Sequence, residues 1–115
     1  MCLAAIKKSI EELLSNNTGE IDVEKVYSLS VEFIKEFTKI VDKRFEDAEW
    51  WRIEVLDDAV DVISDKLGGI AAIYEVWDAI WDAKIERKKV SVETLRKLLS
   101  IVELAERMCE MGKIT

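Results

Sequence analysis

Apolar residues recur along this chain at spacings of three and four positions, which is the period of an amphipathic helix. No alternating run of apolar and polar residues is long enough to predict a strand. The pattern predicts helices over about residues 2–15, 22–43, 47–67, 70–88 and 91–111. We therefore expect one all-α domain, residues 1–115, built as a four- or five-helix bundle that forms part of a helical homo-oligomer.

The glycines divide the chain at the ends of these apolar segments. All four of them lie between segments or after the last one, and the chain contains no proline. Glycine is unfavourable inside a helix and common just beyond its C-terminal end. The predicted helix ends are therefore marked by Gly19, by Gly68 with Gly69, and by Gly112.

Two of the predicted helices begin with the same local chemistry. Asp22 and Ser91 each stand just before an apolar segment, where a side-chain oxygen can cap the first free N–H groups. Each is preceded by an apolar residue, Ile21 or Val90, that suits a hydrophobic staple. The two segments diverge beyond these residues, so the likeness indicates shared capping chemistry and not an internal repeat.

The segment from residue 22 to residue 67 contains neither glycine nor proline. As one helix it would span about 69 Å at 1.5 Å per residue, whereas a compact domain of this size has a radius of gyration near 13 Å. The polar run over residues 42–47, with Asp47 able to cap a new helix, predicts a break there. A single continuous helix covered by an oligomer remains the alternative.

The last predicted helix carries more apolar surface than one core requires. Besides a main seam from Leu95 to Cys109, it has a second seam on another side. An edge helix of a monomer needs one apolar stripe, so the second seam predicts a homodimer. Trp50 adds a predicted contact, since tryptophan is enriched in interface hot spots and this one falls on the polar side of its helix. The predicted interface residues are Trp50, Ile101, Leu104, Met108 and Met111.

The fourth predicted helix has a band of small residues beside its main apolar face. Ala72, Ala79 and Ala83 follow one another at helical spacing. Small side chains allow another helix to approach closely. This band is therefore consistent with assembly of helices from two chains.

Charge and hydropathy exclude several classes of protein. The chain has 24 acidic and 17 basic residues, a net charge of −7, which disfavours direct binding to nucleic acid. The densest basic segment, residues 84–89, itself contains Glu86. No uncharged stretch approaches the roughly 20 residues of a membrane-spanning helix, and the N-terminus does not resemble a signal peptide. We therefore expect a cytoplasmic protein with no membrane partner.

The residue usage bears on stability and on the two cysteines. Glutamine and histidine are absent, and lysine and glutamate are abundant, which is typical of thermostable proteins from hyperthermophiles. Cys2 and Cys109 are interpreted as two reduced thiols. Intracellular disulfides do occur in hyperthermophiles, so a bridge between them stays open.

No catalytic residue is assigned. Without histidine the chain has no Ser-His or Cys-His pair, and no glycine-rich phosphate loop is present. The most suggestive cluster is a run of acids at helical spacing, opposite the apolar face of residues 53–67. We interpret it as a solvated face, with a Mg²⁺ site as the alternative. Its members are Glu54, Asp57, Asp58, Asp61 and Asp65.

Residues 54–57, Glu-Val-Leu-Asp, resemble the ExxD half of the motif in all-α nucleotide pyrophosphohydrolases of the MazG type. The resemblance implies a Mg²⁺-dependent activity on nucleotides. It would place the metal on Glu54, Asp57, Asp58 and Asp61, with Glu32 or Glu36 from the preceding helix.

The sequence favours a small, non-catalytic helical assembly protein that self-associates, most simply as a dimer. It also suggests a protein partner, whose identity the sequence does not give. The pyrophosphohydrolase, for which magnesium would be the cofactor, is the alternative. A third hypothesis is an acidic decoy for a basic nucleic-acid-binding partner. It rests on the acids of residues 54–65 and on a second acidic stripe, Glu75, Asp78, Asp82 and Glu86.

Overall fold

The computed structural model describes residues 3–17 and 19–111 and is all-α, which confirms the predicted fold class. Two very short strands accompany the helices, together with one turn of 3₁₀ helix at Lys43–Phe45. The elements, in chain order, are α1 (Ala4–Ser15), β1 (Glu20–Ile21), α2 (Val23–Val41), α3 (Ile53–Lys66), α4 (Ala72–Glu86), β2 (Val90–Ser91) and α5 (Val92–Glu110).

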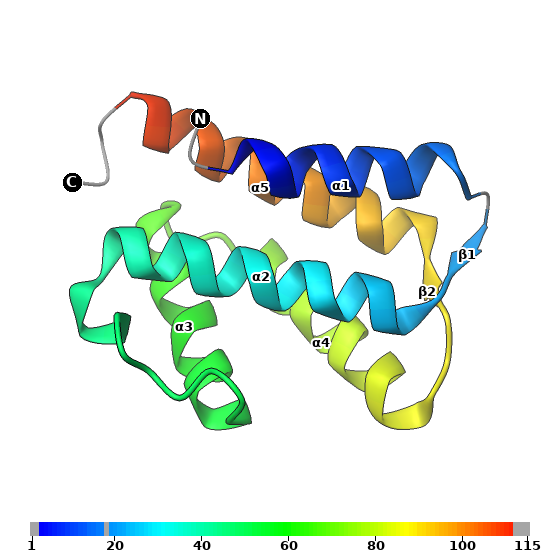
Figure 1. Cartoon of the computed structure of the whole chain (residues 1–115), viewed down its shortest axis with the longest axis horizontal. Coiled ribbons are helices and arrows are strands. Elements are labelled where there is room, and N and C mark those ends of the chain that lie inside the picture. The colour runs from blue at the N-terminus through cyan, green and yellow to red at the C-terminus, as the bar shows by residue number, and fades with distance from the viewer. Residues whose placement is uncertain (1–2, 18, 112–115) are drawn as a thin grey trace.

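The helices pack in two layers around α2. Helices α1 and α2 form the front layer, with α5 behind α1 and with α3 and α4 behind α2 (Figure 1). Helix α2 contacts each of the other four helices. Its buried face includes Phe33 and Phe37, whose rings stack with centroids 5.8 Å apart. The radius of gyration is 13.4 Å, close to that expected for one compact domain.

The chain breaks at Asp42, so the continuous helix over residues 22–67 is wrong. Asp42 has an extended backbone (φ −145°), and its carboxylate accepts a hydrogen bond from the Arg44 backbone N–H at 3.0 Å. The Arg44 guanidinium, 2.6 Å from the same carboxylate, holds the pKa of Asp42 below its ordinary value. These contacts start a new turn and prevent α2 from continuing.

Helix α3 starts at Ile53, six residues after the predicted start at Asp47. The intervening loop folds back on itself because the Trp50 ring packs against Phe45, with ring centroids 5.9 Å apart. Asp47 lies in a turn of this loop and does not cap α3. The predicted break is therefore confirmed, but the loop is longer than its polar residues indicated.

Two predicted helix caps, Asp22 and Ser91, are confirmed. The Asp22 carboxylate accepts from the Glu24 backbone N–H, and the Ser91 hydroxyl accepts from the Thr94 backbone N–H. Gly68 and Gly69 end α3 with φ values of 91° and 77°, in the left-handed region that glycine adopts readily. Gly112 lies outside the described residues.

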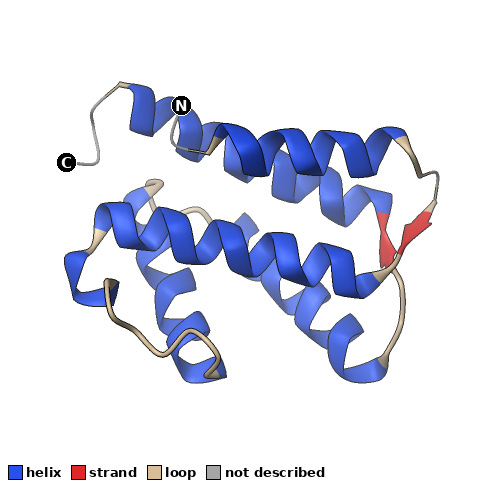
Figure 2. Cartoon of the chain, viewed as in Figure 1, coloured by secondary structure: helices blue, strands red, loops and turns tan. Residues whose placement is uncertain are grey.

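The two similar helix starts lie side by side. Residues Glu20 and Ile21 pair antiparallel with Ser91 and Val90, and Val92 donates a backbone hydrogen bond to the Gly19 carbonyl at 2.8 Å (Figure 2). Ile21 and Val90 are both buried. This pairing could not be predicted from the sequence, because two-residue strands are too short to show alternation.

The first turn of α1 is fastened to the end of α5. The Leu3 backbone N–H donates to the buried carboxylate of Glu106, and Lys7 pairs with Glu103 at 3.6 Å. Cys109 is disulfide-bonded, contrary to the expected reduced thiol, and Cys2 lies outside the described residues. None of the described helices combines the length and apolar character needed to cross a membrane.

Because α2 is central, substitutions at its buried and exposed positions should differ strongly in their effect on the free energy of unfolding. Phe37→Ala should lower the free energy of unfolding by about 3–5 kcal/mol, because the cavity left in the core cannot collapse fully. Ile40→Ala, on the same helix but with the side chain 38% exposed, should cost less than about 1 kcal/mol. Urea unfolding followed by circular dichroism measures both, and equal losses would contradict this account of the core.

Candidate functional site

The predicted interface residues on α5 divide between the core and the surface. Ile101 is buried within the chain's own core, Leu104 and Met108 are half-buried, and Met111 is 62% exposed. The second seam of α5 is therefore only partly covered by the chain itself. The uncovered part runs along the C-terminal half of the helix.

The two adjacent tryptophans have opposite environments. Trp50 is half-buried against Phe45, whereas Trp51 is 80% exposed. Trp50 was predicted to lie on the polar side of a helix. That prediction is wrong, because neither tryptophan lies in α3. The exposed tryptophan at the surface of this loop is Trp51.

Helices α4 and α5 share a surface to which both contribute small or apolar residues. A depression of about 390 Å³ is lined by Ala79 and Ala83 of α4 and by Thr94 of α5. Charged residues line it as well, namely Asp82, Glu86, Lys88 and Lys89. On α5, residues seven apart return to nearly the same side of the helix, so Ile101 and Met108 follow Thr94 along this flank. We call this surface the α4–α5 face and define it by Ala72, Ala79, Ala83, Thr94, Leu104, Met108 and Met111.

The acids proposed as metal ligands do not converge. Glu54, Asp57, Asp58 and Asp61 are all exposed along α3. Two of them bind α4 instead: Asp57 accepts a hydrogen bond from Trp77 Nε1 at 3.0 Å, and Asp61 accepts one from the Tyr74 hydroxyl at 2.7 Å. Across residues 3–17 and 19–111, no three acidic or cysteine side chains are grouped so that they could hold a metal ion.

The second acidic stripe lies on the surface of α4. Glu75, Asp78, Asp82 and Glu86 are all exposed. This exposure fits a solvated face as well as it fits a phosphate mimic. The decoy hypothesis therefore stays a prediction.

An aromatic cluster lies between α2 and α4. Tyr27 of α2 has its ring centroid 6.0 Å from that of Trp77 and 6.1 Å from that of Trp81, and the two tryptophans are 6.2 Å apart. Lys84 completes the cluster, with Nζ 4.8 Å from the Tyr27 ring centroid and 2.7 Å from a Glu24 carboxylate oxygen. The cluster joins residues far apart in sequence, which is why the sequence analysis did not find it.

The ionisation of both tyrosines reflects these surroundings. Burial among the aromatic rings raises the pKa of Tyr27, and the nearby Lys84 ammonium partly opposes that effect. The hydrogen bond to the Asp61 carboxylate raises the pKa of Tyr74, because it stabilises the protonated hydroxyl. Both hydroxyls are therefore protonated, and available as donors, well above neutral pH.

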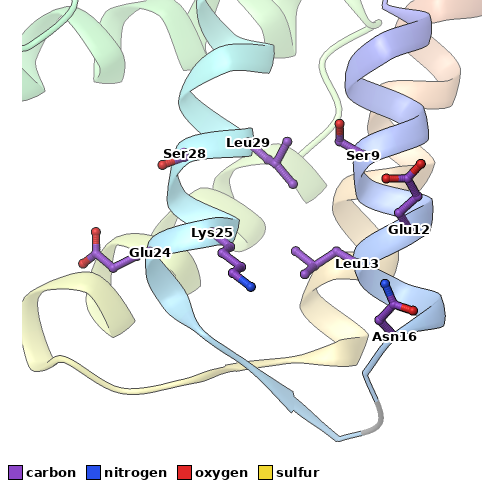
Figure 3. Close-up of a pocket in the computed structure, with 8 residues that line it drawn as sticks. All are labelled: Ser9, Glu12, Leu13, Asn16, Glu24, Lys25, Ser28 and Leu29. Atoms are coloured by element: carbon purple, nitrogen blue, oxygen red, sulfur yellow. The ribbon is translucent and has the colours of Figure 1, made fainter.

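A further groove of about 520 Å³ separates α1 from α2 (Figure 3). Leu13 and Leu29 point toward one another across it, while Ser28 and Glu24 point away from α1 (Figure 3). Its polar lining is mixed, with Glu12 and Lys25 of opposite charge. The lining of this groove therefore does not indicate which charge or which kind of ligand would bind there.

The fold is that of an all-α domain, and its described part contains no group of acidic or cysteine side chains that could hold a metal ion. QacR-like protein C-terminal regions, a TetR-type family, match residues 3–100, from the start of α1 to the middle of α5. The chain belongs to this family. No curated protein and no solved structure gives a significant match. The matched family differs from the pyrophosphohydrolases that residues 54–57 resemble.

The bond between α3 and α4 can be tested with two neighbouring acids. Asp57→Ala should lower the free energy of unfolding by about 1–2 kcal/mol, because the part-buried Trp77 N–H loses its acceptor. Asp58→Ala is the matched control, since the Asp58 side chain is exposed and makes no hydrogen bond or ion pair within the described chain. Its cost should stay within about 0.5 kcal/mol. Chemical denaturation followed by tryptophan fluorescence compares the two, and equal stability of the variants would contradict the assigned bond.

Proposed function

We propose that this chain is a non-catalytic assembly domain that forms a homodimer through the α4–α5 face. The observation that carries the proposal is the apolar flank along the C-terminal half of α5, where Leu104, Met108 and Met111 remain partly or largely exposed. These residues are spaced four and three apart, which is the spacing of a helix–helix seam. A second copy would cover them.

The alanines of α4 suit the same interface. Ala79 is exposed and Ala72 is half-buried, so a partner helix can approach α4 closely at these two positions, whereas Ala83 is buried. In a two-fold dimer the same face meets itself, so α4 and α5 of each chain would form a four-helix arrangement. Small residues on one helix opposite methionines on the other can interdigitate without a cavity, because methionine adapts its shape.

Family membership supports assembly in general terms. TetR-type C-terminal domains are helical and typically dimerise. The matched residues end at Ser100, so Leu104, Met108 and Met111 lie beyond them. The particular residues proposed for the interface therefore rest on this chain's own surface.

Ala79→Arg tests the dimer without touching the core. Ala79 is exposed in the single chain, so the variant should keep its helicity and its stability within about 0.5 kcal/mol. In the dimer the substitution places one arginine from each chain against the facing helices, and we expect at least a tenfold loss of affinity, about 1.4 kcal/mol or more. Sedimentation equilibrium measures the mass against the 13.2 kDa of one chain.

Ala5→Arg is the matched control, an exposed alanine on α1, a helix that does not belong to the α4–α5 face. It should dimerise as the unmodified chain does. An unmodified chain that sediments as a monomer at micromolar concentration refutes the dimer. A dimer that survives Ala79→Arg shows that another face is used.

A further inference from the structure

A second groove, of about 870 Å³, lies where the beginning of α2 meets the end of α4. Its apolar wall is formed by Val23 and Tyr27 of α2 and by Trp81 and Ile85 of α4. Ile85 is 61% exposed although it is large and aliphatic. The groove has the size of a small-molecule site and a wall of aromatic and aliphatic side chains, which such sites usually have.

The rim of this groove is positively charged, whereas the chain as a whole is negatively charged. Lys84, Arg87, Lys88 and Lys89 line it, against only two acids, Asp22 and Glu24. The chain as a whole carries −7. A cationic rim on an acidic protein concentrates positive potential at one place, which favours an anionic ligand there.

Two of these cations remain free to bind a ligand. Lys84 pairs with Glu24 and Lys88 with Glu86. The side chains of Arg87 and Lys89 form no ion pair or hydrogen bond with the described residues. Their charges are therefore not neutralised by contacts in residues 3–17 and 19–111.

The backbone after α4 brings these cations to the groove. Arg87 has a left-handed conformation, φ 57° and ψ 42°, which is costly for a residue with a side chain. The next residue, Lys88, donates a backbone hydrogen bond to the Ala83 carbonyl at 2.9 Å and so closes the helix end. This turn directs residues 87–89 along the groove toward β2.

The groove already holds a carboxylate of the chain itself. The Glu24 oxygens lie 2.7 and 2.8 Å from Lys84 Nζ, and the same ammonium lies over the Tyr27 ring. An aromatic ring, a cation and a carboxylate therefore occur together in the geometry that a bound aromatic acid would require. Glu24 is 63% exposed on its side chain, so solvent and a ligand can reach this ion pair.

We propose that the α2–α4 groove binds a small aromatic carboxylate. Its ring lies against Tyr27 and Trp81, where aromatic pairs gain stability beyond their buried area. Its carboxylate lies between Lys84 and the free cations Arg87 and Lys89, where charge-assisted hydrogen bonds are strong. No covalent step is involved.

This proposal does not depend on the dimer. Trp81 and Ala79 are two residues apart, about 200° around α4, so the groove and the α4–α5 face lie on opposite flanks of that helix. The Ala79→Arg chain should bind the carboxylate as well as the unmodified chain does. Failure of one proposal can therefore be told from failure of the other.

The test uses the whole chain and 2-naphthoate as the probe, with 2-naphthylmethanol and 2-naphthylmethylammonium as neutral and cationic probes of the same ring. The four tryptophan indole N–H signals are followed by ¹H–¹⁵N NMR. We expect 2-naphthoate to shift the Trp81 signal and to leave that of Trp51, on the loop before α3, unchanged. The other two probes should bind at least about tenfold more weakly.

Three variants locate the charge. Lys89→Gln should weaken binding several-fold and Lys84→Gln about tenfold, whereas Glu24→Gln should strengthen it because it removes the competing carboxylate. Lys43→Gln, an exposed lysine outside the groove, is the control. The exposed Lys89 side chain makes no ion pair or hydrogen bond within the described chain, so its variant remains informative if Lys84→Gln fails to fold.

Three results would overturn the proposal. The first is the absence of any shift of Trp81 up to the solubility limit of 2-naphthoate. The second is equal binding of all three probes, which would make the groove an unselective apolar surface. Preference for the cationic probe would be equally decisive, since it would reverse the required sign of charge.

Discussion

Burial of α2 is the constraint on which the rest of the fold depends. This helix contacts each of the other four, and Phe33, Ile34 and Phe37 on its inner face are almost completely buried. An apolar face that long cannot be covered by one neighbour, so α1, α3, α4 and α5 must all pack around it. The polar contacts then fix how they do so: the β1–β2 pair aligns the starts of α2 and α5, and Glu106 fastens α1 to α5.

This arrangement leaves α4 with two different flanks. One flank adjoins α5 and carries alanines, and the other adjoins α2 and carries Trp81 and Ile85. The inner side of α4, with Trp77 and Ile80, fills the core between them. Within α4 itself the two surfaces use different residues, whereas Lys88 and Lys89, which follow the helix, line both the groove and the α4–α5 depression.

Much of the fold could be read from the sequence because it depends on local chemistry. The helices follow the spacing of apolar residues, and Asp22, Ser91 and the glycine pair mark helix ends through contacts within a few residues. The start of α3 could not be read in this way, because the packing of Trp50 on Phe45 decides it and not a cap. The groove was equally hidden: Glu24 and Lys84 are 60 residues apart, and only the fold brings them together. The basic segment 84–89 could be recognised in the sequence, but its position beside aromatic rings could not be predicted from it.

The central claim, that two copies meet through the α4–α5 face, is tested most directly by NMR on a dimer of one isotope-labelled and one unlabelled chain. The account predicts intermolecular nuclear Overhauser effects between the Met108 methyl group and the methyl groups of Ala72 or Ala79. Intermolecular effects at Ile85 or Trp51, with none at Met108, would contradict it and place the contact on another face.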